Sequence, residues 1–115
     1  MTDIIYKIVP AELWRQAEET GVFGGAPIDL ADGYIHFSTG MQARRTAELY
    51  FKGQDDLLLV AVDGGRLGGA LKYEPSRGGD LFPHLYARLA LDAVIWKKPL
   101  PMRADGYHDF PEGIA

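Results

Sequence analysis

Polar and aromatic side chains of the kind found in binding sites occupy alternate positions in a short segment of the chain. Tyr34, His36 and Ser38 alternate there with Ile35 and Phe37. Because side chains along a strand point to opposite faces in turn, the first three residues would share one face. Tyrosine, histidine and serine together are unusual for a buried core. They suit the wall of a cleft.

Two later segments repeat this pattern. His84, Tyr86 and Arg88 alternate with apolar residues in segment 82–89, and Glu74 lies on the polar face of segment 70–74. If the polar faces of the three segments meet, they form one pocket. We expect that pocket to contain His36, Ser38, Glu74, His84, Tyr86 and Arg88.

Each of these residues also has a purely structural interpretation. A lone histidine in a strand is more often hydrogen-bonded within the fold than catalytic. Ser38 and Thr39 would cap a helix, and Gln42 would complete a capping box with Thr39. Tyr86 could be a core aromatic with its hydroxyl at the surface. Glu74 precedes a proline and could be an exposed strand end.

Several kinds of chemistry are excluded or unsupported by the sequence. The chain has no cysteine, so a cysteine nucleophile, a disulfide and thiolate zinc ligation are excluded. There is no G-x-S-x-G nucleophile elbow, and the glycines of segment 64–69 do not match a P-loop. The histidines lack the local spacing of metal ligands, and no metal site is predicted.

Hydrophobic patterning predicts the elements that hold these residues. Helices are predicted at 11–20 and 40–52, and strands at 4–9, 34–38, 57–62, 70–74, 82–89 and 93–98. The order is β-α-β-α-β-β-β-β. Early helices followed by a run of strands indicate an α+β fold that is mostly antiparallel in its second half. The tail from about residue 99 carries three prolines and is predicted to be irregular.

Composition restricts the class of protein further. The 115 residues, 47% hydrophobic and 24% charged, predict one globular domain over 1–115. A net charge of −4 argues against non-specific nucleic-acid binding. No apolar run is long enough to span a bilayer, and the N-terminus lacks the features of a signal peptide. We therefore expect a cytoplasmic protein without membrane partners.

The motifs together resemble a known bacterial family, the domain of unknown function numbered nine hundred and fifty-two. The resemblance is carried by Asp-Gly-Tyr-Ile-His-Phe-Ser-Thr at 32–39 and Phe-Pro-His-Leu-Tyr at 82–86, supported by segments 4–8 and 72–74. It runs from about residue 4 to residue 96. Ala87 departs from the pattern, where a glycine is expected after the tyrosine.

The resemblance implies a fold and a class of ligand. The family is similar at the superfamily level to ADP-ribosyltransferase-like domains, which include RNA 2′-phosphotransferases. It implies a split, mostly antiparallel β-sheet with two early helices packed on it. It also implies a cleft that in relatives holds NAD or an ADP-ribosyl group, so that NAD would be a substrate and a small nucleotide the partner.

The resemblance also implies roles for individual residues. His36 would hold a ribose, and Tyr86 or His84 would flank the nicotinamide. Glu74 is the candidate acid that stabilises positive charge on the ribose, although it precedes the segment 82–86 instead of following it. The remaining ligand-binding candidates are Tyr34, Ser38, Thr39, Gln42, Arg45 and Arg88, with the two arginines as phosphate contacts.

Three classes of function remain open on the sequence. The first is an enzyme that transfers or removes an ADP-ribosyl group. The second is a ligand-binding module that keeps the cleft without turnover, and the third is a structural or interaction protein in which His36 and His84 only support the fold. A fold-level resemblance does not by itself choose among them.

Overall fold

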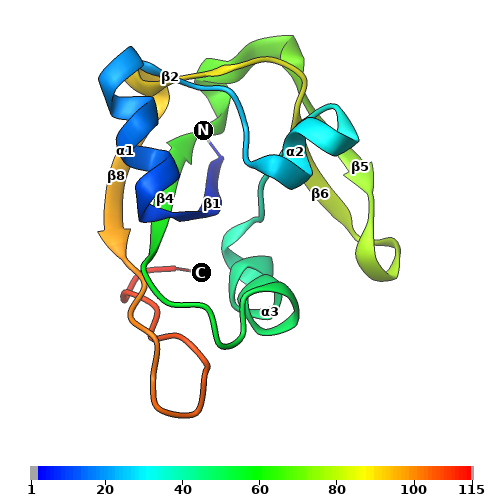
Figure 1. Cartoon of the computed structure of the whole chain (residues 1–115). Coiled ribbons are helices and arrows are strands. Elements are labelled where there is room, and N and C mark those ends of the chain that lie inside the picture. The colour runs from blue at the N-terminus through cyan, green and yellow to red at the C-terminus, as the bar shows by residue number, and fades with distance from the viewer. Residues whose placement is uncertain (1–2, 115) are drawn as a thin grey trace.

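The computed structural model describes residues 3–114, in which three α-helices and three antiparallel β-sheets form a mixed α+β domain (Figure 1). The α-helices are α1 (Ala11–Thr20), α2 (Pro27–Asp32) and α3 (Gly40–Tyr50). The strands are β1 (Ile4–Pro10), β2 (Val22–Phe23), β3 (Ile35–His36), β4 (Leu57–Asp63), β5 (Leu71–Pro75), β6 (Leu81–Leu85), β7 (Leu89–Ala90) and β8 (Val94–Pro99). Short 3₁₀ turns lie at η1 (Gly64–Ala70), η2 (Arg77–Gly79) and η3 (Leu91–Ala93).

The largest sheet has the order β1-β4-β8, with the apolar strand β4 in its centre as the sequence predicts. Its two faces are buried against different partners. Ile5 and Val9 pack in one apolar cluster with Trp14 of α1. Tyr6 and Ile8 pack on the opposite face, in a cluster that includes the two buried alanines of α3. Alternation along β1 therefore assigns one helix to each face.

A second sheet, of order β3-β6-β5, carries the predicted polar face. His36 of β3 pairs with His84 of β6, and His84 pairs with Lys72 of β5, so these three residues form one row across the sheet. In Figure 1, β5, β6 and α2 stand apart from β1, β4 and β8. A backbone bridge joins the two sheets, in which the amides of Tyr6 and Ser38 each donate to the other's carbonyl at 2.8 Å.

Residues 22–33 are predicted from the sequence to be a loop without helix or strand. This prediction, and with it the predicted order of elements, is wrong. This segment contains β2 and α2. Pro27 begins α2 at a position that needs no amide donor. The Asp29 carboxylate accepts the Ala26 amide at 2.8 Å, and Gly33, with φ of 88°, ends the helix. Six helical residues are too few for a periodic pattern to be detected.

The predicted strands 34–38 and 82–89 are also longer than the observed ones. β3 is limited to Ile35–His36, and the second segment divides into β6, which ends at Leu85, and β7. The amide of Tyr86 donates to the Ala70 carbonyl, and β7 pairs with β2. The chain therefore changes sheets between residues 85 and 89, which the alternating pattern does not reveal.

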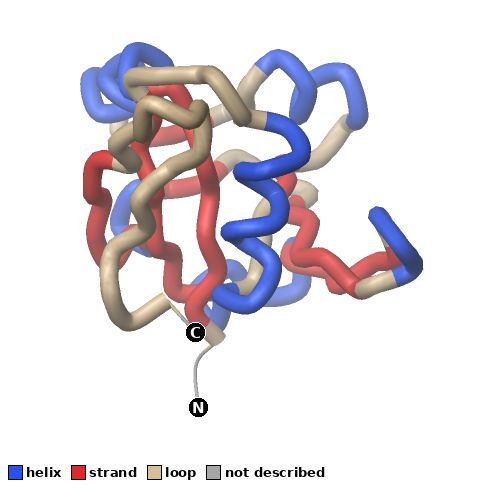
Figure 2. Tube along the Cα trace, turned by 90° about the horizontal axis from the view of Figure 1, so that it is seen from below, coloured by secondary structure: helices blue, strands red, loops and turns tan. Residues whose placement is uncertain are grey.

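The segment after β8 has little regular structure, but it is packed against the domain. Met102 and His108 form a bridge, and the His108 ring donates from Nε2 to the Gln54 carbonyl at 2.7 Å. Leu100 and Ile114 are buried in the cluster beneath α3. Seen from below in Figure 2, this segment runs as a tan tube in front of the red strands. Within residues 3–114, none of the helices has the length and apolarity required to cross a bilayer.

Candidate functional site

A cleft of about 510 Å³ lies where the two larger sheets diverge. The Tyr6–Ser38 bridge forms part of its wall. Of the residues predicted from the sequence, Tyr34, His36, Ser38 and His84 line it. The polar faces of 34–38 and 82–86 therefore do meet. The Ser38 hydroxyl is within 3.0 Å of the Thr46 hydroxyl on α3, which fixes its position in the wall.

Tyr34 is the centre of a cluster of rings in this wall. Its ring stacks on His84, with centroids 4.1 Å apart and planes inclined by 28°. The centroid of His36 lies 4.6 Å from Tyr34 and that of Tyr86 lies 5.3 Å from it. The two imidazoles meet edge to face, with centroids 5.6 Å apart. The cluster presents flat ring surfaces and imidazole nitrogens at the same place.

His84 is oriented by Glu74. Its side chain is almost fully buried, and Nδ1 lies 2.8 Å from Oε1 of Glu74. The Tyr86 hydroxyl donates to the same oxygen at 2.6 Å. The hydrogen bond from Tyr86, and to a lesser extent that from His84, holds the pKa of Glu74 below its usual value. The bond between Tyr86 and Glu74 also raises the pKa of Tyr86 to about 12. Glu74 does not line the cleft itself.

A buried ion pair that was not predicted from the sequence lies at the wall of the cleft, where Lys7 is a lining residue. Lys7 of β1 and Asp29 of α2 are 5% and 2% exposed, and Nζ lies 2.9 Å from the carboxylate. Burial alone would raise the pKa of Asp29. The hydrogen bond from His36, the charge of Lys7 and the Ala26 amide outweigh burial and lower this pKa to about 2. Burial lowers the pKa of Lys7, although Asp29 opposes the shift.

His36 connects this ion pair to the cleft. Its Nδ1 lies 2.6 Å from Oδ1 of Asp29, and its backbone amide donates to the same oxygen at 3.0 Å. Its Nε2 lies 2.9 Å from Oδ2 of Asp32, an exposed residue in the cleft wall. An ionised carboxylate only accepts hydrogen bonds. Both nitrogens of His36 therefore face carboxylate oxygens.

Four residues predicted as ligand contacts have other surroundings. Arg45 pairs with Glu48 at 3.2 Å on the exposed side of α3, and Arg88 is exposed between β6 and β7. Neither lines the cleft. The Thr39 amide donates to Gln42 Oε1 at 3.0 Å, and Gln42 Nε2 donates to the Leu81 carbonyl at 2.9 Å. Thr39 and Gln42 thus form the capping arrangement and fasten α3 to β6.

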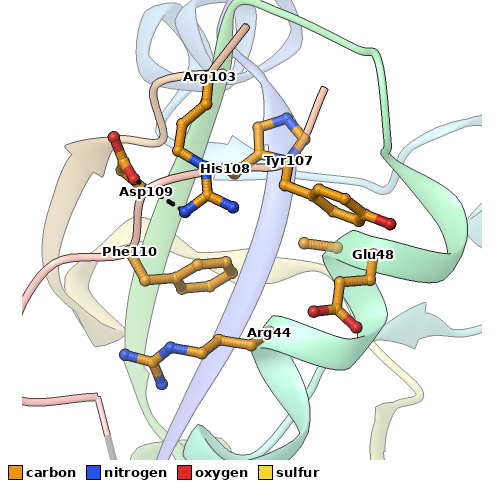
Figure 3. Close-up of a pocket in the computed structure, with 8 residues that line it drawn as sticks. Arg44, Glu48, Arg103, Tyr107, His108, Asp109 and Phe110 are labelled. Atoms are coloured by element: carbon orange, nitrogen blue, oxygen red, sulfur yellow. Dashed lines mark hydrogen bonds and ion pairs between the residues drawn. The ribbon is translucent and has the colours of Figure 1, made fainter. Parts of the chain in front are cut away.

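A smaller cavity of about 220 Å³ lies between α3 and the C-terminal segment (Figure 3). Arg103 there pairs with Asp109 at 3.4 Å, and the Arg44 guanidinium lies over the Phe110 ring at 5.2 Å. These charged groups have partners within the fold, and no predicted site residue lines the cavity. In the described part of the chain, no group of three or more histidines and acidic residues is placed so that it could hold a metal ion.

The fold and the cleft define a small α+β domain with a wall of histidine and tyrosine between two antiparallel sheets. Residues 8–97 match the family described as protein of unknown function (DUF952), and the chain belongs to this family. The resemblance to this family, which was predicted from the sequence motifs, is confirmed.

Solved structures agree with this assignment. The crystal structure of protein CC0527 from Caulobacter crescentus is 46% identical, covers 92% of this chain and 93% of its own, and superposes with a TM-score of 0.89. The solution NMR structure of CC0527 is 47% identical over 90% of each chain, with a TM-score of 0.82. No curated protein matches the chain.

Proposed function

We propose that the cleft binds a nucleotide of the NAD or ADP-ribosyl class and that the protein acts on such a nucleotide. The observation that supports this proposal best is the ring cluster of Tyr34, His36 and His84 in a cleft of about 510 Å³. Clefts of about 300–1,000 Å³ with aromatic walls and a few convergent polar groups are typical small-molecule sites.

The cleft suggests a division of contacts for such a ligand. A flat heterocycle would stack against Tyr34, which lines the cleft, in preference to Tyr86, which is exposed and outside it. The nicotinamide ring of NAD carries a positive charge, and the face of a tyrosine attracts cations. His36, at the polar end beside Asp32, would then hold ribose hydroxyls.

One observation favours the second candidate, a binding module without turnover of NAD. A carboxylate that stabilises positive charge on a ribose must face the ligand. Glu74 does not line the cleft, and its Oε1 already accepts from two side chains.

Asp32 is the carboxylate in the wall of the cleft. We therefore expect any stabilising acid to be Asp32.

An amide NMR titration with NAD, and in parallel with ADP-ribose, tests the proposal. We expect saturable shifts at residues 34–38 and 82–86, and loss of binding in His36→Ala. The matched control is His108→Gln, which replaces a histidine outside this cleft whose Nε2 donates to a backbone carbonyl. Absence of shifts at millimolar ligand would refute the nucleotide proposal. Release of free nicotinamide from NAD would separate an enzyme from a binding module.

A further inference from the structure

The two histidines of the cleft are each held through Nδ1 by a carboxylate, and we infer that their Nε2 atoms differ in hydrogen-bonding state. Each ring has its Nδ1 within hydrogen-bond distance of an acid, Glu74 for His84 and Asp29 for His36. Their ring centroids are 5.6 Å apart. Groups at this separation can contact two atoms of one bound ligand. Their hydrogen-bonding states therefore define what the cleft can do.

His84 presents an acceptor. Glu74 accepts from Tyr86 and has a lowered pKa, so it is ionised and His84 must donate to it through Nδ1. An imidazole whose only hydrogen is on Nδ1 keeps a lone pair on Nε2. This atom has no side-chain or backbone partner in residues 3–114, and it is not a buried orphan. His84 lines the cleft, and Nε2 is the nitrogen that its bond to Glu74 leaves for a ligand.

His36 presents a donor. Asp29 accepts from Lys7, the Ala26 amide and the His36 amide, and these bonds fix its carboxylate in one orientation. Nδ1 of His36 donates to this carboxylate. Nε2 donates to Asp32, whose side chain is 42% exposed at the cleft. A ligand that displaces Asp32 meets an N–H group. Asp29 does not line the cleft and is a positioning residue for His36, and Lys7, which does line it, holds Asp29 in place.

We propose that His84 and His36 form a general acid–base pair that hydrolyses an O-linked ADP-ribosyl group. Water attacks the C1 atom of the ribose that is joined to the leaving oxygen, and His84 Nε2 takes the proton that water loses. The C–O bond to the leaving alcohol breaks, and its oxygen takes the proton of His36 Nε2. The products are ADP-ribose and the free alcohol, and solvent returns the proton from His84 to His36.

The donor state of His36 selects this class of bond. An alcohol leaves poorly as an alkoxide and gains from a proton donated during bond breaking. Nicotinamide leaves NAD as a neutral ring and needs no proton, so NAD would make no use of His36 as an acid. The inference rests on the proposed function for the ADP-ribosyl part of the ligand. The states of the two histidines do not depend on it.

The states of the histidines can be measured in the free protein by long-range ¹H–¹⁵N correlation of the imidazole nitrogens. We expect hydrogen on Nδ1 alone in His84 and on both nitrogens in His36. Asp29→Asn and Lys7→Met should change the His36 pattern, whereas Asp92→Asn, an exposed acid outside the cleft, should not. Hydrogen on Nε2 of His84, or a His36 pattern unchanged in Asp29→Asn, would overturn the proposal.

The activity is tested with a peptide that carries ADP-ribose on a serine hydroxyl, and with NAD as the matched ligand that lacks a leaving alcohol. We expect release of ADP-ribose from the peptide, with kcat lowered about 10²–10⁴-fold in His36→Gln and in His84→Gln. Binding of the peptide in the cleft without cleavage, or equally fast cleavage of NAD, would refute hydrolysis. Failure of both ligands and of ADP-ribose to bind would refute the proposed function as well.

Discussion

The ring of Tyr34 lies over the ring of His84, with centroids 4.1 Å apart. Because Tyr34 also contacts His36, it maintains the spacing of the two imidazoles. Aromatic pairs contribute about 0.5–1.5 kcal/mol beyond the area that they bury. We expect Tyr34→Ala to lower the free energy of unfolding by about 1–2 kcal/mol in urea denaturation, and to weaken ligand binding. Tyr34→Phe keeps the ring and should be near wild type. Equal losses in both variants would contradict a role for stacking.

The buried pair of Lys7 and Asp29 should be sensitive to the loss of either partner. Removing one member of a buried ion pair leaves the other charge without compensation and costs about 3–5 kcal/mol. We therefore expect Asp29→Asn and Lys7→Met each to destabilise the fold strongly, and the double variant to lose less than the sum of the two. Denaturant unfolding of all three variants measures this coupling. The exposed pair of Arg45 and Glu48 is the control, and its removal should change stability by less than about 1 kcal/mol.

Asp29 should also make stability depend on pH in the acid range. Its pKa is lowered from 3.8 to about 2 in the folded protein. The ionised form therefore stabilises the fold above the pKa of the unfolded chain, and this contribution is lost as pH falls from about 4 to about 2. The loss should be on the order of 2 kcal/mol. Thermal unfolding between pH 5 and pH 2 measures it. The same acid slope in Asp29→Asn would show that other carboxylates are responsible.

Tyr86 should titrate abnormally. Its hydrogen bond to Glu74 raises the pKa of the hydroxyl to about 12. Glu74→Gln removes the negative acceptor, so the pKa of Tyr86 should fall toward 10. In the converse variant, Tyr86→Phe, the pKa of Glu74 should rise because the hydrogen bond that lowers it most is lost. NMR titration of labelled tyrosine and glutamate side chains follows both. An unchanged Tyr86 titration in Glu74→Gln would contradict the bond.

The residues predicted as ligand contacts outside the cleft should behave differently from those inside it. Gln42→Ala removes bonds to the Thr39 amide and the Leu81 carbonyl, and should cost about 1–2 kcal/mol of stability. Arg45→Ala and Arg88→Ala should leave both stability and nucleotide binding unchanged, because neither residue lines the cleft. Isothermal titration with ADP-ribose distinguishes these cases. A large loss of affinity in Arg88→Ala would place the ligand beyond the cleft.

The polar faces were predictable because they depend on alternation, which is a local property of strands. Tyr34, His36, Ser38 and His84 do line one cleft, and the register of β3 with β6 brings the two histidines opposite each other. The alternation fails at Arg88, because the regular strand ends at Leu85. Where the chain leaves one sheet for another depends on tertiary partners, which a single sequence does not contain.

The Lys7–Asp29 pair was missed for a related reason. Lys7 lies between apolar residues of β1, and a lysine at an interior strand position is the signal that could have indicated a buried partner. The partner is 22 residues away, in a helix too short to be predicted. Only the fold brings the two together. A strand lysine of this kind is worth treating as evidence of a buried acid.

The Tyr6–Ser38 bridge is made of main-chain atoms only. The spacing of the two sheets at this point is therefore independent of which side chains line the cleft. Substitutions at the wall can change ligand preference while the framework keeps its dimensions. Relatives of this chain could in this way diverge in specificity without loss of shape, and the same separation makes the cleft a suitable starting point for engineering new binding sites.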